Sequence, residues 1–85
     1  MAYRVEFTKS AEKAFDRLDP ASRKRIAVEI TRLGENPRHP GIIKLESEHD
    51  LYRVRVGSYR IVFSIEDDKL IVLVVKIGHR REIYR

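Results

Sequence analysis

Residues 52–65 read YRVRVGSYRIVFSI, and apolar and polar side chains alternate on both sides of the dipeptide Gly57-Ser58. Alternation with a period of two is typical of a strand that buries one face. A glycine at the first central position suits a two-residue turn of type II′. The stretch therefore predicts a β-hairpin that turns at residues 57 and 58.

The two-residue turn also predicts which residues face each other across the hairpin. Arg55 lies directly opposite Arg60, and Arg53 lies opposite Val62, because side chains on one face recur every second residue. One face is apolar and is expected to lie under the helices, whereas the other is basic. The apolar face holds Tyr52, Val54, Val56, Tyr59, Ile61 and Phe63, and the basic face holds Arg53, Arg55, Arg60, Val62 and Ser64.

The facing arginines indicate an anion-binding site. Like charges directly opposite each other destabilise a sheet by up to about 1 kcal/mol. A phosphate held by the guanidinium forks would offset this repulsion and explain the arrangement. The alternative is that an acidic side chain of the preceding loop neutralises the arginines, and the candidates are Glu46, Glu48 and Asp50.

The N-terminal part of the chain predicts one strand followed by two helices. Residues 3–7 alternate as a half-buried strand, and Thr8 or Ser10 can cap the first helix. Asp19-Pro20 is a typical helix start, and Gly34 is a suitable end for the second helix. Apolar residues recur at helical spacing in both segments, so each helix is expected to bury one side.

The C-terminal half predicts a sheet. Residues 35–50 are expected to form a loop, with Ile42, Ile43 and Leu45 anchored on the core. Residues 70–77 are apolar on both faces, which is typical of a strand in the middle of a sheet. The predicted order is β-α-α-β-β-β, an α+β fold with two N-terminal helices packed on one face of a small, mainly antiparallel sheet.

Composition limits the classes of protein to which the chain can belong. Its 85 residues predict a single domain, residues 1–85, and the absence of cysteine excludes disulfides, thiolate zinc sites and cysteine nucleophiles. The longest apolar run, residues 70–75, is too short to span a membrane. We therefore expect a cytoplasmic protein with no membrane partner.

The net charge of +5 is concentrated near the C-terminus. Residues 51–65 contain three arginines and no acid, and residues 76–85 contain four cations and one acid. Clustered cations attract polyanions such as nucleic acid backbones. Gly78 would allow a bend after the last strand, which would turn His79, Arg80 and Tyr84 back towards the arginines.

These segments resemble the RelE/ParE toxin superfamily of prokaryotic toxin–antitoxin pairs, and most of all its RelE-type mRNA endonucleases. The resemblance covers nearly the whole chain. It rests on the predicted element order and on three segments, which read LYRVRVGSYRIVF, DDKLIVLVVKIGHR and REIYR.

The resemblance implies ribosome-dependent cleavage of messenger RNA, in which a 2′-hydroxyl attacks the adjacent phosphate and the 5′-oxygen leaves. It implies a cognate antitoxin, binding to operator DNA only through that antitoxin, and no metal or other cofactor. By motif position, the implied catalytic residues are Arg53, Arg55, Arg60, Arg80 and Tyr84, and the expected RNA-binding residues are Lys44, His79 and Arg81.

The chain departs from the family that it resembles at the first hairpin strand. Relatives often carry lysines where this chain has Arg53 and Arg55. Arginine does not lose its proton, so these two side chains are expected to act through their charge alone.

Two other functions fit the same fold. One is a ParE-type toxin that inhibits DNA gyrase without cleaving nucleic acid, and the other is a nucleic-acid-binding domain without catalysis. A fold does not decide between them, because function resides in the site.

Overall fold

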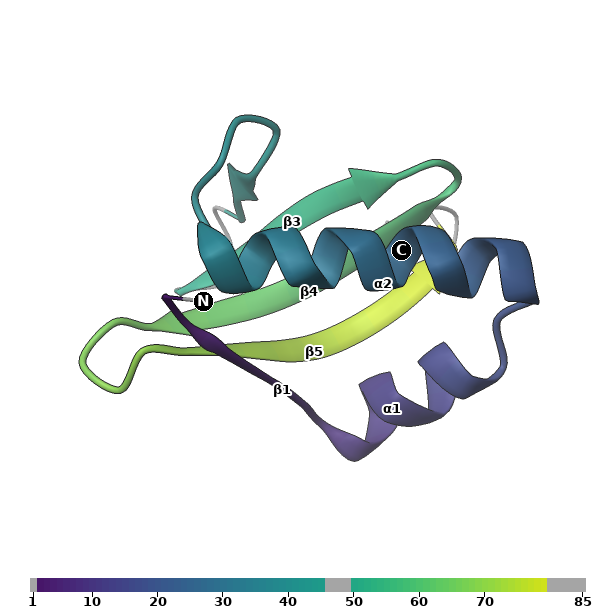
Figure 1. Ribbon diagram of the computed structural model, residues 1–85, viewed down its shortest axis with the longest axis horizontal. Coiled ribbons are helices and arrows are strands. Elements are labelled where there is room, and N and C mark those ends of the chain that lie inside the picture. Colours follow the sequence, from purple (N-terminus) through teal and green to yellow (C-terminus); the bar gives the residue numbers. More distant parts are fainter. Residues whose placement is uncertain (1, 46–49, 80–85) are drawn as a thin grey trace.

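A computed structural model of the chain describes residues 2–45 and 50–79, and Figure 1 shows its arrangement. The predicted α+β order is confirmed, with one further short strand. The elements are β1 (Arg4–Phe7), α1 (Lys9–Asp16), α2 (Pro20–Glu35), β2 (Ile43–Lys44), β3 (Leu51–Val56), β4 (Tyr59–Glu66) and β5 (Ile71–His79).

The strands form one sheet in the order β1-β5-β4-β3-β2. β1 runs parallel to β5, and the other neighbours are antiparallel. β5 lies between β1 and β4, so its predicted place inside the sheet is confirmed. α2 lies across the sheet in Figure 1, and α1 lies nearer its β1–β5 side.

The core lies between the helices and one face of the sheet. Ile26 and Leu33 of α2 are fully buried, as are Ile61 and Phe63 of β4. These residues belong to the apolar stripes predicted for the second helix and for the hairpin. Burying one large aliphatic or aromatic side chain contributes about 1.5–3 kcal/mol, so this shared core holds the helices on that face.

Both predicted helix starts are present, but the end of α2 differs from the prediction. The Thr8 hydroxyl accepts a hydrogen bond from the Ala11 amide, and the Asp19 carboxylate accepts one from the Ser22 amide. α2 continues through Gly34 to Glu35. Gly34 is buried, and its carbonyl accepts a hydrogen bond from the Tyr3 amide at 2.8 Å. It thus joins α2 to the start of the sheet instead of ending the helix.

The segment predicted as a loop contains the short strand β2, which pairs with β3 at the edge of the sheet. Ile42 is half-buried against the core, as expected, and Leu45 is also half-buried. The expectation that Ile43 anchors the core was wrong, because Ile43 is 49% exposed. A two-residue strand carries too little alternation to be recognised from sequence.

A polar cluster holds the loop after α2 against the turn between β4 and β5. Arg38 forms two hydrogen bonds with the Asp67 carboxylate, at 3.0 and 2.8 Å, and the Tyr3 hydroxyl donates a third at 2.6 Å. The bonds from Arg38, and then from Tyr3, lower the pKa of Asp67 to about 2. The same contact with Asp67 raises the pKa of Tyr3.

We expect this cluster to weaken in acid. The folded pKa of Asp67 lies below the unfolded value of about 3.9, so its contribution is present above that value and is lost as the pH falls towards about 2. Asp67→Asn should therefore reduce the loss of stability between about pH 4 and pH 2. Urea denaturation at a series of pH values measures this, and unchanged acid dependence would contradict it.

The described residues contain no helix long and apolar enough to cross a membrane.

Candidate functional site

The β3–β4 hairpin has the predicted register. Val56 pairs with Tyr59, Arg55 with Arg60, and Arg53 with Val62. Gly57 has a φ of +60°, which a glycine adopts without strain, and Ser58 has no positive φ, as a type II′ turn requires. A Cβ atom at position 57 would also come within 3.2 Å of the Arg25 guanidinium.

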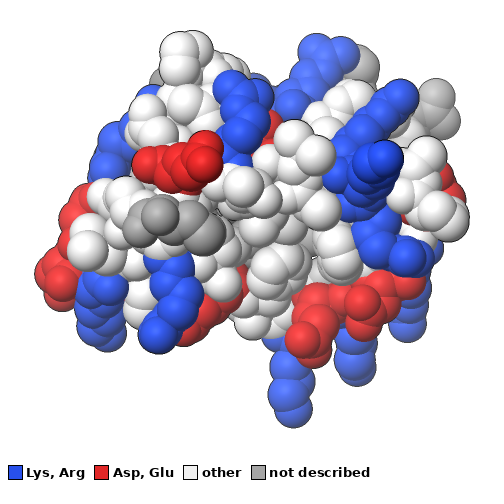
Figure 2. Space-filling model, in the orientation of Figure 1, with Lys and Arg blue, Asp and Glu red and all other residues white. Residues whose placement is uncertain are grey.

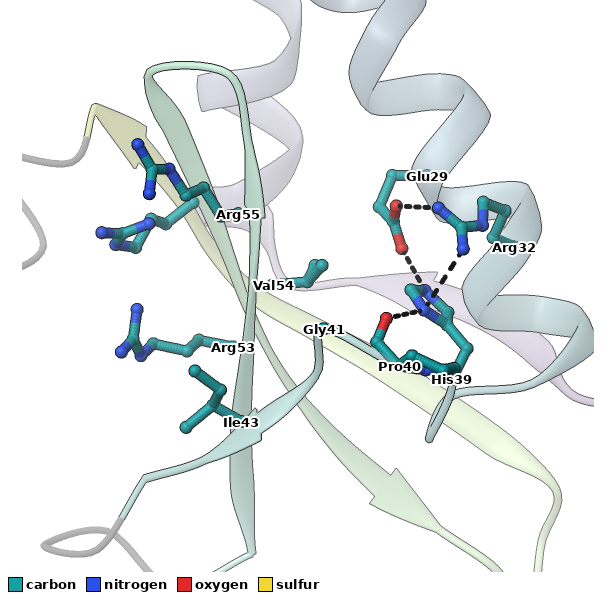
Figure 3. A pocket seen from close by; sticks show the side chains of 10 residues that line it. Glu29, Arg32, His39, Pro40, Gly41, Ile43, Arg53, Val54 and Arg55 are labelled. Carbon is teal, nitrogen blue, oxygen red and sulfur yellow. Dashed lines mark hydrogen bonds and ion pairs between the residues drawn. The ribbon is translucent and has the colours of Figure 1, made fainter.

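This register places three arginines on the face of the sheet that points away from the helices, which we call the arginine face. Figure 3 shows Arg53 and Arg55 pointing away from α2, while Val54 points towards it. Arg60 is only 5% exposed, Arg53 is half-buried and Arg55 is exposed. The residue paired with Arg60 on β5 is Gly78, which carries no side chain.

A cavity of about 440 Å³ lies along the exposed part of β3. The arginines lie on one side of this strand, and side chains of α2 and the following loop lie on the other (Figure 3). Ile43 of β2 lies beside Arg53 because the two residues are paired. The lining residues are Glu29, Arg32, His39, Pro40, Gly41, Ile43, Arg53, Val54, Arg55 and Arg60.

The helix side of this cavity is built on a buried hydrogen bond between Glu29 and His39. The Glu29 carboxylate contacts His39 Nε2 at 2.6 Å, and His39 Nδ1 contacts the Pro40 carbonyl at 2.7 Å. Arg32 Nη2 also lies 3.4 Å from His39 Nδ1, so the imidazole ring links α2 to the loop that follows it. Arg32 adds a weaker contact to Glu29 at 3.4 Å. This contact holds residues 39–41 against α2 and so positions the segment that leads into β2.

Two of the predicted RNA-binding residues do not share the arginine face. Lys44 pairs with Tyr52, so it lies on the helix-side face of the sheet and is exposed there. β5 continues through Gly78 without the expected bend, and His79 pairs with Tyr59, again on the helix side. The two rings meet edge to face at 5.7 Å. His79 lines a separate cavity of about 300 Å³ beside α1.

The remaining predictions for this site concern residues that the structure does not describe. Arg80, Arg81 and Tyr84 lie outside the described residues, as do Glu46 and Glu48 of the neutralising loop. Asp50 is described and exposed, and it forms no ion pair with any described residue. Asp50, the one candidate acid that the structure describes, therefore does not neutralise the arginines.

The structure adds residues that the sequence interpretation did not assign to the site. Glu29 and His39 are ten residues apart on a helix and a loop, and no sequence signal joins them. Lys76 pairs with Val62 and therefore lies on the arginine face. Its position follows from a change of register between β4 and β5 that the uniformly apolar β5 sequence does not reveal.

The charge on the helix side of the molecule has a different distribution. Figure 2 shows that face with cationic, anionic and uncharged side chains interspersed. On the arginine face, by contrast, the strand positions around Arg53, Arg55 and Arg60 hold no acidic residue in the described register. An anion is thus favoured on that face by charge.

We expect the arginine face to cost stability when no anion is bound. Arg55→Gln removes one of two facing cations, and stability should rise by about 0.2–1 kcal/mol at low salt. The gain should shrink at about 1 M salt, where screening acts within about 3 Å. Urea denaturation at low and high salt measures both effects, with Arg17→Gln, an exposed arginine beside α1, as the control. A loss of stability in Arg55→Gln would contradict the expectation.

Comparisons with known proteins agree with this fold. A family model described as the ParE toxin of type II toxin–antitoxin systems (parDE) matches residues 5–84. The chain is 31% identical over 88 residues to the mRNA interferase toxin RelE of Escherichia coli K12, covering 99% of this chain and 92% of that protein.

Solved structures of RelE proteins have the same architecture. The E. coli RelBE toxin–antitoxin complex matches with a TM-score of 0.82 and 29% identity, covering 92% of this chain and 96% of that one. The RelE–RelB complex of Pyrococcus horikoshii OT3 matches with a TM-score of 0.80 and 33% identity, covering 94% and 97%. The match to the family model over nearly the whole length, with relatives at this level of identity, shows that the chain belongs to the RelE/ParE family of toxins of type II toxin–antitoxin systems.

Proposed function

We propose that this toxin is a ribosome-dependent mRNA endonuclease. The observation that carries the proposal is the convergence of Arg53, Arg55 and Arg60 on one face, with Arg60 buried between two strands. Three guanidiniums on two neighbouring strands bind a phosphodiester and stabilise the negative charge that develops on it during cleavage. The similarity to a protein named mRNA interferase supports the same reaction.

The proposed step is an intramolecular transesterification at the phosphate of the cleaved bond. The 2′-oxygen forms a bond to phosphorus, the bond from phosphorus to the 5′-oxygen breaks, and the products are a 2′,3′-cyclic phosphate and a 5′-hydroxyl end. The proton of the 2′-hydroxyl goes to a base, and the 5′-oxygen receives a proton as it leaves. Catalysis of phosphoryl transfer depends mainly on positioning and charge stabilisation, which the arginines supply.

Proton transfer needs groups other than these arginines, because a guanidinium keeps its proton in proteins. Tyr84 is our candidate acceptor, and Arg80 is a further cation of the site; both assignments rest on the terminal motif. A phenol has an ordinary pKa of about 10, and nearby cations lower the pKa of such a group. Arg81 remains a candidate for binding the RNA backbone.

The proposed partners are a ribosome carrying mRNA and a cognate antitoxin. RelE proteins of E. coli and P. horikoshii were solved as complexes with RelB. We propose that an antitoxin of this kind inhibits this chain and that operator DNA is bound only through the antitoxin. We propose a cytoplasmic location, because the substrate is found there.

The test uses purified full-length protein and ribosomes programmed with a defined message. Primer extension maps the new ends for wild type, Arg60→Met and Tyr84→Phe. We expect cleavage of messages on ribosomes by the wild type and much slower cleavage by both variants. A parallel assay of DNA gyrase supercoiling tests the ParE-type alternative. Intact messages together with blocked supercoiling would overturn the nuclease proposal.

A further inference from the structure

β5 contains a bulge that changes which of its side chains face the arginines. From Ile71 to Val74 each residue pairs with β4 in one register, and from Lys76 to His79 the register is shifted by one residue. Val75 is the extra residue, because Val62 and Phe63 pair with Lys76 and Val74 respectively. Two residues of one strand then oppose one of the other, which is the definition of a β-bulge.

The bulge is held by Thr8, the residue that caps the start of α1. The Thr8 hydroxyl donates a hydrogen bond to the Val75 carbonyl at 3.0 Å and accepts one from the Ala11 amide at 3.1 Å. The Thr8 amide donates to the Val74 carbonyl at 3.0 Å. The extra residue is therefore part of the hydrogen-bonded structure that joins β5 to the first helix.

The bulge determines the side of the sheet on which Lys76 lies. With strict alternation Lys76 would share the face of Val72 and Val74, which are fully buried under the helices. With the extra residue, Ile77 occupies that face at 5% exposure and Lys76 is exposed on the arginine face. Lys76 forms no ion pair with any carboxylate of the described part of the chain.

Lys76 and Arg53 lie in one row across the sheet. Arg53 pairs with Val62, and Val62 pairs with Lys76, so the two cations flank the buried Val62. Neighbouring strands are about 4.8 Å apart, which places the two backbones about 10 Å from each other. The adjacent row contains Arg55, Arg60 and Gly78. Four cations thus occupy two neighbouring rows.

The acidic residues of the arginine face lie at the end of the strands away from Lys76. Glu66 pairs with Ile71 at the far end of β4, and Glu6 pairs with Leu73 on β5. Glu6 also forms an ion pair with Arg4 at 2.9 Å. The charge of the face therefore changes along the strands, and the cationic end is the one that includes Lys76.

We propose that Lys76 is a binding residue for single-stranded RNA. It holds a backbone phosphate next to the one bound by Arg53, Arg55 and Arg60, so the strand crosses the sheet from β3 towards β5. This inference rests on the proposed function, because it extends the same phosphate site. A lysine suits the position since its ammonium is a point charge that accepts many phosphate geometries, whereas the arginine forks fix the geometry of the reacting phosphate.

Salt-dependent binding of the full-length protein to short single-stranded RNA tests this role. Each phosphate contact contributes about 0.7 to the slope of log affinity against log salt for a single strand. Lys76→Gln should reduce the slope by about 0.7 and weaken binding equally for RNAs of different sequence. Lys76→Arg should retain the wild-type slope, because the charge is kept. Fluorescence anisotropy with labelled oligonucleotides measures both properties.

Lys13→Gln is the matched control. Lys13 is an exposed lysine on α1, on the opposite side of the sheet, and its replacement changes the net charge by the same amount. We expect the wild-type slope for this variant. A wild-type slope for Lys76→Gln, or an equal reduction in Lys13→Gln, would overturn the proposal, because the effect would then be absent or due to net charge alone.

The results separate this inference from the nuclease proposal. If messages on ribosomes are cleaved and Lys76→Gln keeps the wild-type slope, the role of Lys76 is wrong and the nuclease proposal stands. If messages stay intact and Lys76→Gln still lowers the slope, the nuclease proposal fails and the phosphate contact stands.

Discussion

Replacing Arg60 by methionine should slow mRNA cleavage on ribosomes by about 100- to 1,000-fold, the effect of removing one preorganised donor from a site that stabilises developing charge. Arg60 is 5% exposed and lies between Arg55 and Gly78 in the sheet. Its guanidinium is thus held by its surroundings before the RNA arrives. A preorganised charge needs no rearrangement during the reaction, and for this reason its loss is expected to be large.

Single-turnover cleavage with saturating programmed ribosomes is the measurement for Arg60→Met. Methionine has a similar length, so packing around the position is retained while the charge is lost. Arg60→Lys should fall between wild type and methionine, because an ammonium keeps the charge and loses the planar fork. Arg17→Gln, outside the arginine face, should cleave like the wild type.

Thermal denaturation shows whether these variants remain folded. A folded Arg60→Met protein that cleaves at a rate close to wild type would remove Arg60 from the catalytic set. The remaining arginines would then have to be tested one at a time.

Replacing Glu29 by glutamine should destabilise the fold by about 1–3 kcal/mol, because it weakens a buried hydrogen bond between the Glu29 carboxylate and His39. Glu29 and His39 are 6% and 8% exposed, and their contact is 2.6 Å long. For a domain of this size, each kcal/mol lowers the melting temperature by about 4–8 °C. Urea and thermal denaturation should therefore both detect a large change.

A double replacement distinguishes the lost polar contact from a loss of packing. Glu29→Leu combined with His39→Leu removes both polar groups, and it should recover most of the stability lost in Glu29→Gln. Glu35→Gln, at an exposed position of the same helix, should stay within about 0.5 kcal/mol of wild type. A Glu29→Gln protein as stable as the Glu35→Gln control would show that the pair contributes little.

The sequence predicted the hairpin more completely than any other part of the fold. A glycine followed by serine between two alternating runs specifies a two-residue turn, and the turn specifies every pair along both strands. The sequence alone therefore predicts that Arg55 faces Arg60, and the register confirms it. Helix starts were predicted for a similar reason, since Thr8 and Asp19 act on amides only a few residues away.

Errors arose where a residue's position depends on a distant part of the chain. Gly34 was expected to end α2, but its carbonyl is used by Tyr3, which lies in another element. His79 was expected beside the arginines, but β5 keeps its pairing with β4 through Gly78 and places His79 opposite Tyr59. Ile43 was expected in the core, but it is paired with Arg53 at the sheet edge. Local periodicity carries no information on such pairings.

By itself, the sequence determined the α+β class, the hairpin register and the basic face, because these follow from turn chemistry and from side-chain alternation between neighbours in the chain. The tertiary structure alone decided that Arg60 is buried while Arg55 is exposed, that Glu29 meets His39, and that Lys76 joins the arginines. The physical reason is the same in each case. Burial, hydrogen bonding and the position of a bulge depend on contacts between segments far apart in sequence, and such contacts form only when the chain packs around its core.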